Sequence, residues 1–222
     1  MTIYLDTADL EIISENIDKN FCGGITTNPS ILSKINNLDY FAHLKKIKQL
    51  CKKYNKSLSI EVTTNDKRKI LKEALKIKKK YNFAKLHIKI PVSHDNLSLI
   101  SNMHKNKIKV NVTCVFTLAQ AYLSADSFGD YISIFYNRTK DLGEDPIKII
   151  KNLRKYIDNH NLKSKIIVGS IRSRQDVEDG ISSGAHIITV PPKIYTELFE
   201  NKGTTNSINQ FLDDIKKIQK RN

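Results

Sequence analysis

Short segments of alternating apolar and polar residues recur along the whole chain, and longer segments with helical periodicity separate them. Alternation with a period of two is typical of β-strands. The strand-like segments are TIYLD (2–6), GITTN (24–28), LSIEV (58–62), KLHIKI (85–90), KIKVNVT (107–113), YISIF (131–135), KIIVGS (165–170) and HIITV (186–190). Between two of them, Ile70, Ala74, Ile77 and Tyr81 form one stripe at helical spacing. The pattern therefore predicts eight strands that alternate with helices.

This alternation in a chain of 222 residues favours an α/β fold of the (β/α)8 TIM-barrel type. A doubly wound open sheet is the alternative, but it usually has fewer strands, and the GxGxxG turn is absent. No linker divides the chain, so we expect one barrel domain over residues 1–222. Residues 204–222 predict an additional C-terminal helix whose apolar stripe either covers its own barrel or packs on a neighbouring subunit. The stripe consists of Ile208, Phe211, Leu212, Ile215 and Ile218.

Composition and charge narrow the functional classes. Met1 leads directly into a strand without a signal peptide, and the longest uncharged stretch (110–125) is too short and polar to span a bilayer. We therefore expect a soluble cytoplasmic protein that does not bind membranes. The net charge of +14 suggests nucleic acid, but only six of the 37 basic residues are Arg, and the lysines are spread over most predicted helices. A solvated surface explains them better, so we predict no nucleic-acid partner.

The cysteines and histidines do not indicate a metal site. Cys22, Cys51 and Cys114 are scattered, which fits small buried thiols in a reducing compartment. The six histidines show no ligand spacing either. We predict that the protein holds no metal.

Polar side chains occur where the predicted strands end. In a TIM barrel, catalytic groups come from the C-terminal ends of several strands, so we expect these side chains to converge on one mouth. They are Asp6, Thr27, Asn28, Glu61, Lys89, Asn111, Thr113, Ser133, Phe135 and Ser170. Each has a structural alternative: Asp6 could cap the first helix, and Asn28, which precedes Pro29, is a good N-cap. Lys89 stands out because both its neighbours are aliphatic and a buried charge is costly.

Schiff-base formation is the chemistry that requires such a lysine. A site of low dielectric constant disfavours the ammonium and leaves a neutral amine that can attack a ketone. The reaction also needs carboxylates to move protons, for which Asp6 and Glu61 are candidates. Amide groups that bind sugar hydroxyls could come from Asn28 and Asn111.

Two arginines predict an anion site beside this mouth. Arg138 follows the sixth strand, near Ser133, and Arg172 follows the seventh strand, near Ser170. Arginine is rare in this chain, and its guanidinium binds phosphate bidentately, where lysine offers a point charge. The alternative is that both arginines form structural ion pairs.

Several motifs in the right order resemble the transaldolase family, and most closely its short bacterial type, which includes the fructose-6-phosphate aldolases. They are DTAD (6–9), GGITTNPSIL (23–32), IEV (60–62), IKIP (88–91), KVNVT (109–113), RTKDLGED (138–145) and GSIR (169–172). The resemblance implies that Lys89 forms the Schiff base and that Asp6 is the acid/base. Glu61 would act with Thr113 through a bound water. It also implies a set of substrate-binding residues: Asn28, Asn111, Ser133, Phe135, Arg138, Ser170 and Arg172.

The resemblance further implies a transaldolase without a cofactor, which moves a dihydroxyacetone unit between sugar phosphates in the pentose phosphate pathway. Glu61 and Phe135 favour this activity, because the related aldolases have Gln and Tyr at these positions. Release of free dihydroxyacetone by a fructose-6-phosphate aldolase is the alternative, and a non-catalytic basic binding protein is a more distant one. Members of this type form rings, so a homo-oligomer, pentameric or decameric, is expected.

Overall fold

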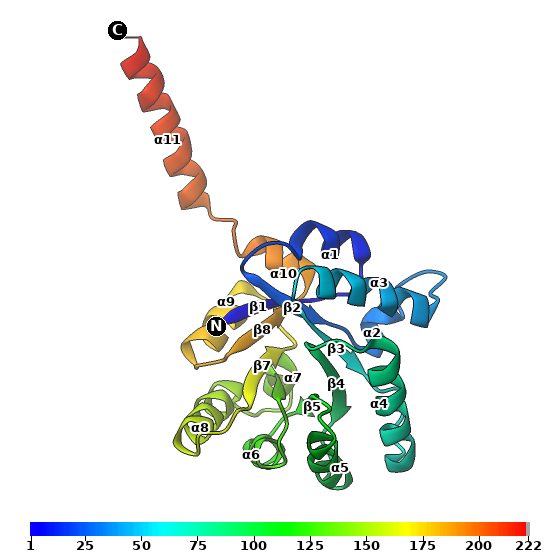
Figure 1. The fold of residues 1–222 in the computed structure, drawn as a ribbon. Helices are drawn as coiled ribbons and strands as arrows, with labels where there is room; N and C mark the ends of the chain where they lie inside the picture. The colour runs from blue at the N-terminus through cyan, green and yellow to red at the C-terminus, as the bar shows by residue number, and fades with distance from the viewer. Residues whose placement is uncertain (221–222) are drawn as a thin grey trace.

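A closed parallel β-barrel forms the centre of the computed structural model, which describes residues 1–220 (Figure 1). The eight strands are hydrogen-bonded in chain order, and β8 pairs with β1. The strands are β1 (Thr2–Asp6), β2 (Cys22–Thr26), β3 (Ser57–Glu61), β4 (Leu86–Pro91), β5 (Val110–Val115), β6 (Tyr131–Phe135), β7 (Lys165–Gly169) and β8 (Ile187–Val190). The predicted (β/α)8 fold is confirmed, and the open sheet is excluded.

Six strands differ from their predicted bounds, four of them by one residue at one or both ends and two, the second and the fifth, by more. The two larger differences have local reasons. The second strand ends at Thr26 and not at residue 28, because Asn28 caps the helix that follows. The fifth strand begins at Val110 and not at residue 107, because Lys107 adopts a φ of 55° in the turn that precedes it. The prediction that Thr27 faces the barrel mouth is wrong: Thr26 and Asn28 face the mouth, whereas the Thr27 hydroxyl donates a hydrogen bond to the carbonyl oxygen of Ser59.

Helices surround the barrel, and N-cap residues mark where most of them begin. They are α1 (Leu10–Asn16), α2 (Pro29–Leu32), α3 (Tyr40–Lys53), α4 (Lys67–Tyr81), α5 (His94–Lys105), α6 (Leu118–Asp126), α7 (Tyr136–Asp141), α8 (Pro146–Asn159), α9 (Arg174–Ser182), α10 (Pro192–Glu197) and α11 (Lys202–Gln219). Asp9, Asp39 and Ser173, for example, accept hydrogen bonds from the first turns of α1, α3 and α9. In residues 1–220, no helix is long and apolar enough to cross a membrane.

The interior of the barrel changes character from one end to the other. Toward the N-terminal ends of the strands, Tyr4, Tyr131, Ile167 and Ile187 form a buried cluster, and His87 stacks on Tyr131 at a centroid distance of 3.9 Å. The inward positions nearer the C-terminal ends are polar. Side chains therefore fill the barrel toward the N-terminal ends of the strands. The polar residues lie at the C-terminal ends, where TIM barrels carry their active sites.

The C-terminal helix α11 projects away from the barrel (Figure 1). None of its described residues is buried, and the side chain of Phe211 on its apolar stripe is 65% exposed. The alternative in which this stripe covers its own barrel is therefore wrong for this chain. The predicted range of 204–222 ends at two residues that lie outside the described part, and the helix itself begins at Lys202.

Candidate active site

A small cavity of about 70 Å³ opens at the C-terminal ends of the strands. Its lining residues are Asp6, Thr26, Asn28, Lys89, Asn111, Ser133, Phe135, Arg138, Gly169, Ser170 and Thr189. Most of the residues predicted for the site are thus brought together. Glu61 and Thr113 are not among the lining residues: Glu61 contacts Lys89 from β3, and Thr113 lies on β5 opposite Pro91 of β4.

Lys89 is held inside the mouth, with its side chain only 6% exposed. Its Nζ lies 3.1 Å from Oε2 of Glu61 and donates a hydrogen bond to the carbonyl oxygen of Thr27 at 3.2 Å. The parallel register explains the pair, because Glu61 and Lys89 are direct neighbours on β3 and β4. A buried lysine beside a carboxylate has a partner that can accept its proton.

Asp6 lies on the opposite side of the mouth at the end of β1. Its Oδ1 accepts a hydrogen bond of 2.6 Å from Thr26, whose hydroxyl is also 2.5 Å from that of Thr189. Burial raises the pKa of the Asp6 carboxyl, while the nearby Lys89 and the Thr26 hydrogen bond oppose this shift. Asp6 does not cap the first helix, because Asp9 does so. A carboxyl whose pKa is raised is suited to proton transfer near neutral pH.

Two asparagines provide amide groups at the mouth. Asn28 caps α2, since its Oδ1 accepts a hydrogen bond of 2.9 Å from the amide of Ile31, and it also lines the cavity. The capping and binding interpretations are therefore compatible for this residue. Asn111 is fully buried, donates to Ser59 Oγ at 3.2 Å and accepts from Ser133 Oγ at 2.6 Å. These bonds fix the orientation of its amide.

Thr113 follows Asn111 by two residues and points the same way along β5. Its hydroxyl is buried and has no hydrogen-bond partner within residues 1–220. The strand is irregular here, because the pairing with β6 shifts between Val112 and Val115, and Cys114 has a φ of 59°. An unpaired buried hydroxyl is costly, so Thr113 is ready to bind a water or a ligand.

The two arginines predicted to bind an anion lie in different surroundings. Arg138 lines the cavity, with its guanidinium carbon 5.0 Å from the centre of the Phe135 ring. Arg172 does not belong to the lining residues, and its exposed guanidinium instead forms a two-bond ion pair with Asp141. Ser170 lines the cavity with an unusual φ of 60°. Of the two guanidiniums, only that of Arg138 faces the cavity.

The sequence interpretation missed Thr26, Thr189 and Ser59, which support the site from neighbouring strands. Thr26 and Thr189 link Asp6 to the seam between β8 and β1, and Ser59 supports Asn111. A signal existed for Thr189, because it is a polar residue within the apolar strand Ile187–Val190. Its place near the C-terminal end of β8 is the same kind of signal that predicted the other site residues.

Comparisons with known proteins agree with this geometry. The model of the family described as Transaldolase/Fructose-6-phosphate aldolase matches residues 3–222. A probable transaldolase of Petrotoga mobilis is 33% identical over 219 residues, which cover 99% of this chain and 96% of the relative. A probable transaldolase 2 of Listeria monocytogenes is 34% identical over 214 residues, which cover 96% of this chain and 95% of the relative.

A more distant structure is similar in fold alone. Thiamine phosphate pyrophosphorylase from Pyrococcus furiosus superposes with a TM-score of 0.60 at 11% identity, over 86% of this chain and 85% of the other. The full-length family match and the two relatives carry more information. The chain belongs to the transaldolase/fructose-6-phosphate aldolase family.

Proposed function

We propose that this protein is a transaldolase that transfers a dihydroxyacetone unit between sugar phosphates through a Schiff base on Lys89. The observation that carries the proposal is the position of the Lys89 amine, which is buried at the barrel mouth between the Glu61 carboxylate and the Thr27 carbonyl. A lysine in these surroundings can become a neutral nucleophile once its proton passes to a neighbouring base. Family membership supports the same reaction class.

The reaction begins at the keto carbon of a ketose phosphate such as fructose 6-phosphate or sedoheptulose 7-phosphate. Lys89 first gives a proton to Glu61, and its nitrogen then bonds to carbon 2 to form a carbinolamine. Protonation of the carbinolamine oxygen releases water and leaves a protonated imine. Thr113 is suited to hold a water for these transfers, because its buried hydroxyl is free within the described chain.

Carbon–carbon cleavage follows. The Asp6 carboxylate takes the proton of the hydroxyl on carbon 4, the bond between carbons 3 and 4 breaks, and its electron pair moves to the imine nitrogen. An aldose phosphate leaves, and an enamine of dihydroxyacetone remains on Lys89. The same steps in reverse join the enamine to an acceptor such as erythrose 4-phosphate, and water then releases the product from the lysine.

The remaining polar residues are proposed to position the substrate. Asn28 and Asn111 bind the hydroxyls of the sugar, and Ser133, Arg138 and Ser170 bind the phosphate end. Arg172 can join them only if its guanidinium leaves Asp141, with which it is paired. Phe135 packs beside Arg138 and shapes the phosphate end of the cavity.

Transfer to an acceptor is preferred over release of free dihydroxyacetone because of Glu61 and Phe135, where the related aldolases have Gln and Tyr. We place the enzyme in the pentose phosphate pathway of the cytoplasm, without a cofactor. An assay of fructose 6-phosphate cleavage with and without erythrose 4-phosphate separates the activities. Equal cleavage in both reactions would indicate the aldolase.

Borohydride trapping tests the mechanism. Reduction in the presence of fructose 6-phosphate should fix a three-carbon or six-carbon adduct to Lys89, identified by peptide mass mapping. Lys89→Met should abolish the adduct and the turnover while the circular dichroism spectrum stays unchanged. Lys85→Met is the matched control, because Lys85 lies just before the same strand and binds the carbonyl of Asn55 outside the cavity. An adduct on another residue would refute the assignment.

We also propose that the enzyme is a homo-oligomer, a ring of five subunits or a pair of such rings, in which α11 packs on a neighbour. The support is the exposed apolar stripe of α11, which includes Phe211 and Ile215. Light scattering should give the mass of the assembly, and Phe211→Asp combined with Ile215→Asp should reduce it. A wild-type protein that is monomeric at micromolar concentration would contradict the proposal.

A further inference from the structure

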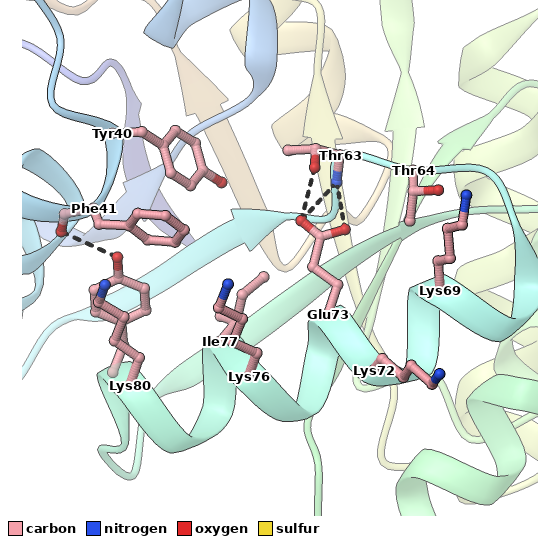
Figure 2. Close-up of a pocket in the computed structure, with 11 residues that line it drawn as sticks. Tyr40, Phe41, Thr63, Thr64, Lys69, Lys72, Glu73, Lys76, Ile77 and Lys80 are labelled. Carbon is pink, nitrogen blue, oxygen red and sulfur yellow. Dashed lines mark hydrogen bonds between the residues drawn. The ribbon is translucent and has the colours of Figure 1, made fainter.

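A second and larger concave site lies outside the barrel mouth, between the start of α3 and one face of α4. Its volume is about 580 Å³, and Figure 2 shows Tyr40 and Phe41 facing the side chains of α4 across it. This volume lies in the range of small-molecule sites. The proposed reaction uses none of its lining residues.

The charges around this groove are unbalanced. Lys69, Lys72, Lys76 and Lys80 line it from α4, against one carboxylate, Glu73. Glu73 is already engaged, because its oxygens accept hydrogen bonds from the amide and hydroxyl of Thr63 at 2.8–3.1 Å. Lys69 is paired with Asp66 at 3.8 Å, so Lys72, Lys76 and Lys80 remain as a positive surface that would attract an anion.

Two of these lysines lie near the same aromatic ring, that of Phe41. The ammonium groups of Lys80 and Lys76 lie 3.8 Å and 5.2 Å from the centre of the Phe41 ring. Within residues 1–220, neither lysine forms an ion pair with a carboxylate. Both ammonium groups thus lack a counter-charge beside the same ring, and a bound phosphate would supply one.

The floor of the groove is apolar and contains an unused hydrogen-bonding group. Phe41, Ile77 and Tyr81 supply aromatic and aliphatic surface, and the Tyr81 hydroxyl is occupied by the carbonyl of Phe41. The hydroxyl of Tyr40 is buried but has no partner in the described chain. Burial raises the pKa of Tyr40 to about 12, so it stays a donor at neutral pH. An inorganic anion would leave both the floor and this donor unused.

We propose that the groove binds a nucleotide, with the phosphates between Lys76 and Lys80 and the base and sugar over the apolar floor, within reach of Tyr40. The charge, the aromatic and aliphatic floor and the size all fit a nucleoside diphosphate. The exposed helix α11 of a second copy is a poorer occupant, because it carries three lysines against two aspartates and would leave the lysines of the groove without a counter-charge.

Calorimetric titration of the full-length protein with ADP, adenosine and pyrophosphate tests the proposal. ADP should bind more tightly than either of its parts, and Lys76→Gln combined with Lys80→Gln should weaken ADP binding about tenfold or more, since both charge-assisted contacts are lost. Lys67→Gln combined with Lys79→Gln is the matched control, because it removes equal charge from α4 outside the groove. Tyr40→Phe should weaken ADP binding and leave pyrophosphate binding unchanged.

Four outcomes would overturn the proposal. They are no binding of ADP, equal affinity for ADP and pyrophosphate, loss of ADP binding in Arg138→Ala, and a change of oligomeric mass in the Lys76/Lys80 variant in place of weaker ADP binding. The third would move the nucleotide to the barrel mouth, and the fourth would identify a neighbouring subunit as the occupant. None of them bears on Lys89, whose role is tested separately by borohydride trapping.

Discussion

The unequal surroundings of Arg138 and Arg172 lead to a prediction about phosphate recognition. Both follow neighbouring strands, but Arg138 lines the cavity, whereas Arg172 is paired with Asp141 outside it. A hydrogen bond to a charged group contributes about 1.5–3 kcal/mol. Arg138→Ala should therefore weaken the binding of fructose 6-phosphate about 10- to 150-fold, since about 1.4 kcal/mol corresponds to a factor of ten.

Arg172→Ala should cost less, because its guanidinium must leave Asp141 before it can reach a phosphate. Asp141→Ala offers a complementary test: it frees Arg172 and should tighten the binding of phosphorylated sugar if this arginine can reach the mouth. These variants change no residue that contacts Lys89.

The assay compares kcat/KM for fructose 6-phosphate and for fructose in each variant. A phosphate contact appears as a loss confined to the phosphorylated sugar. The reasoning fails if Arg172→Ala loses as much as Arg138→Ala, or if Arg138→Ala loses equally on both sugars. Equal losses in the two variants would show that the ion pair between Arg172 and Asp141 opens readily. Equal losses on both sugars would show that Arg138 stabilises the fold and does not bind the phosphate.

Three further predictions follow from buried groups. Because the pKa of Asp6 is raised, kcat/KM should fall at acidic pH with a midpoint above 3.8, the ordinary pKa of an aspartate. Asp6→Asn should remove this pH dependence along with most activity. The pKa of His87 is lowered from 6.5 to about 3, so its contribution to stability is present above 6.5 and is lost as the pH falls toward 3. In urea unfolding, His87→Phe should reduce the loss of stability between pH 7 and pH 5 by about 2 kcal/mol, and a loss equal to that of the wild type would contradict the cause. Part of the loss that remains comes from His186, whose pKa burial lowers to about 4. Gly24→Ala should destabilise the barrel by about 1–3 kcal/mol in the same assay, because its Cβ would lie 2.7 Å from the carbonyl oxygen of Ser57; unchanged stability would show that β2 and β3 can move apart.

Much of the architecture could be predicted because the signals are local. Alternation places the strands, and N-cap residues such as Asp9 and Asp66 start the helices. The candidate site was predictable for a related reason: a parallel barrel brings the C-terminal ends of all its strands to one mouth, so residues far apart in sequence meet there. Lys89 and Glu61 are an example, since strand register alone makes them neighbours.

What could not be predicted depends on side-chain contacts between distant segments. Whether Arg172 faces the mouth or Asp141 depends on two residues 31 positions apart, one at the end of α7 and the other in the loop after β7. The backbone irregularity at Cys114, which accompanies the unpaired hydroxyl of Thr113, has no local signal such as glycine. The direction of α11 could not be predicted either, because an amphipathic stripe does not indicate which surface packs against it.

The hydrogen bonds from Asp6 through Thr26 to Thr189 have a consequence for biosynthesis. They cross the joint where the last strand meets the first two, so this carboxyl acquires its full surroundings only when the barrel closes. A ribosome-bound chain that lacks β8 already contains Lys89, Glu61 and Asp6, yet Thr189 and the enclosure around it are missing. Nascent chains should therefore remain catalytically inactive until residues 187–190 have emerged and β8 has paired with β1.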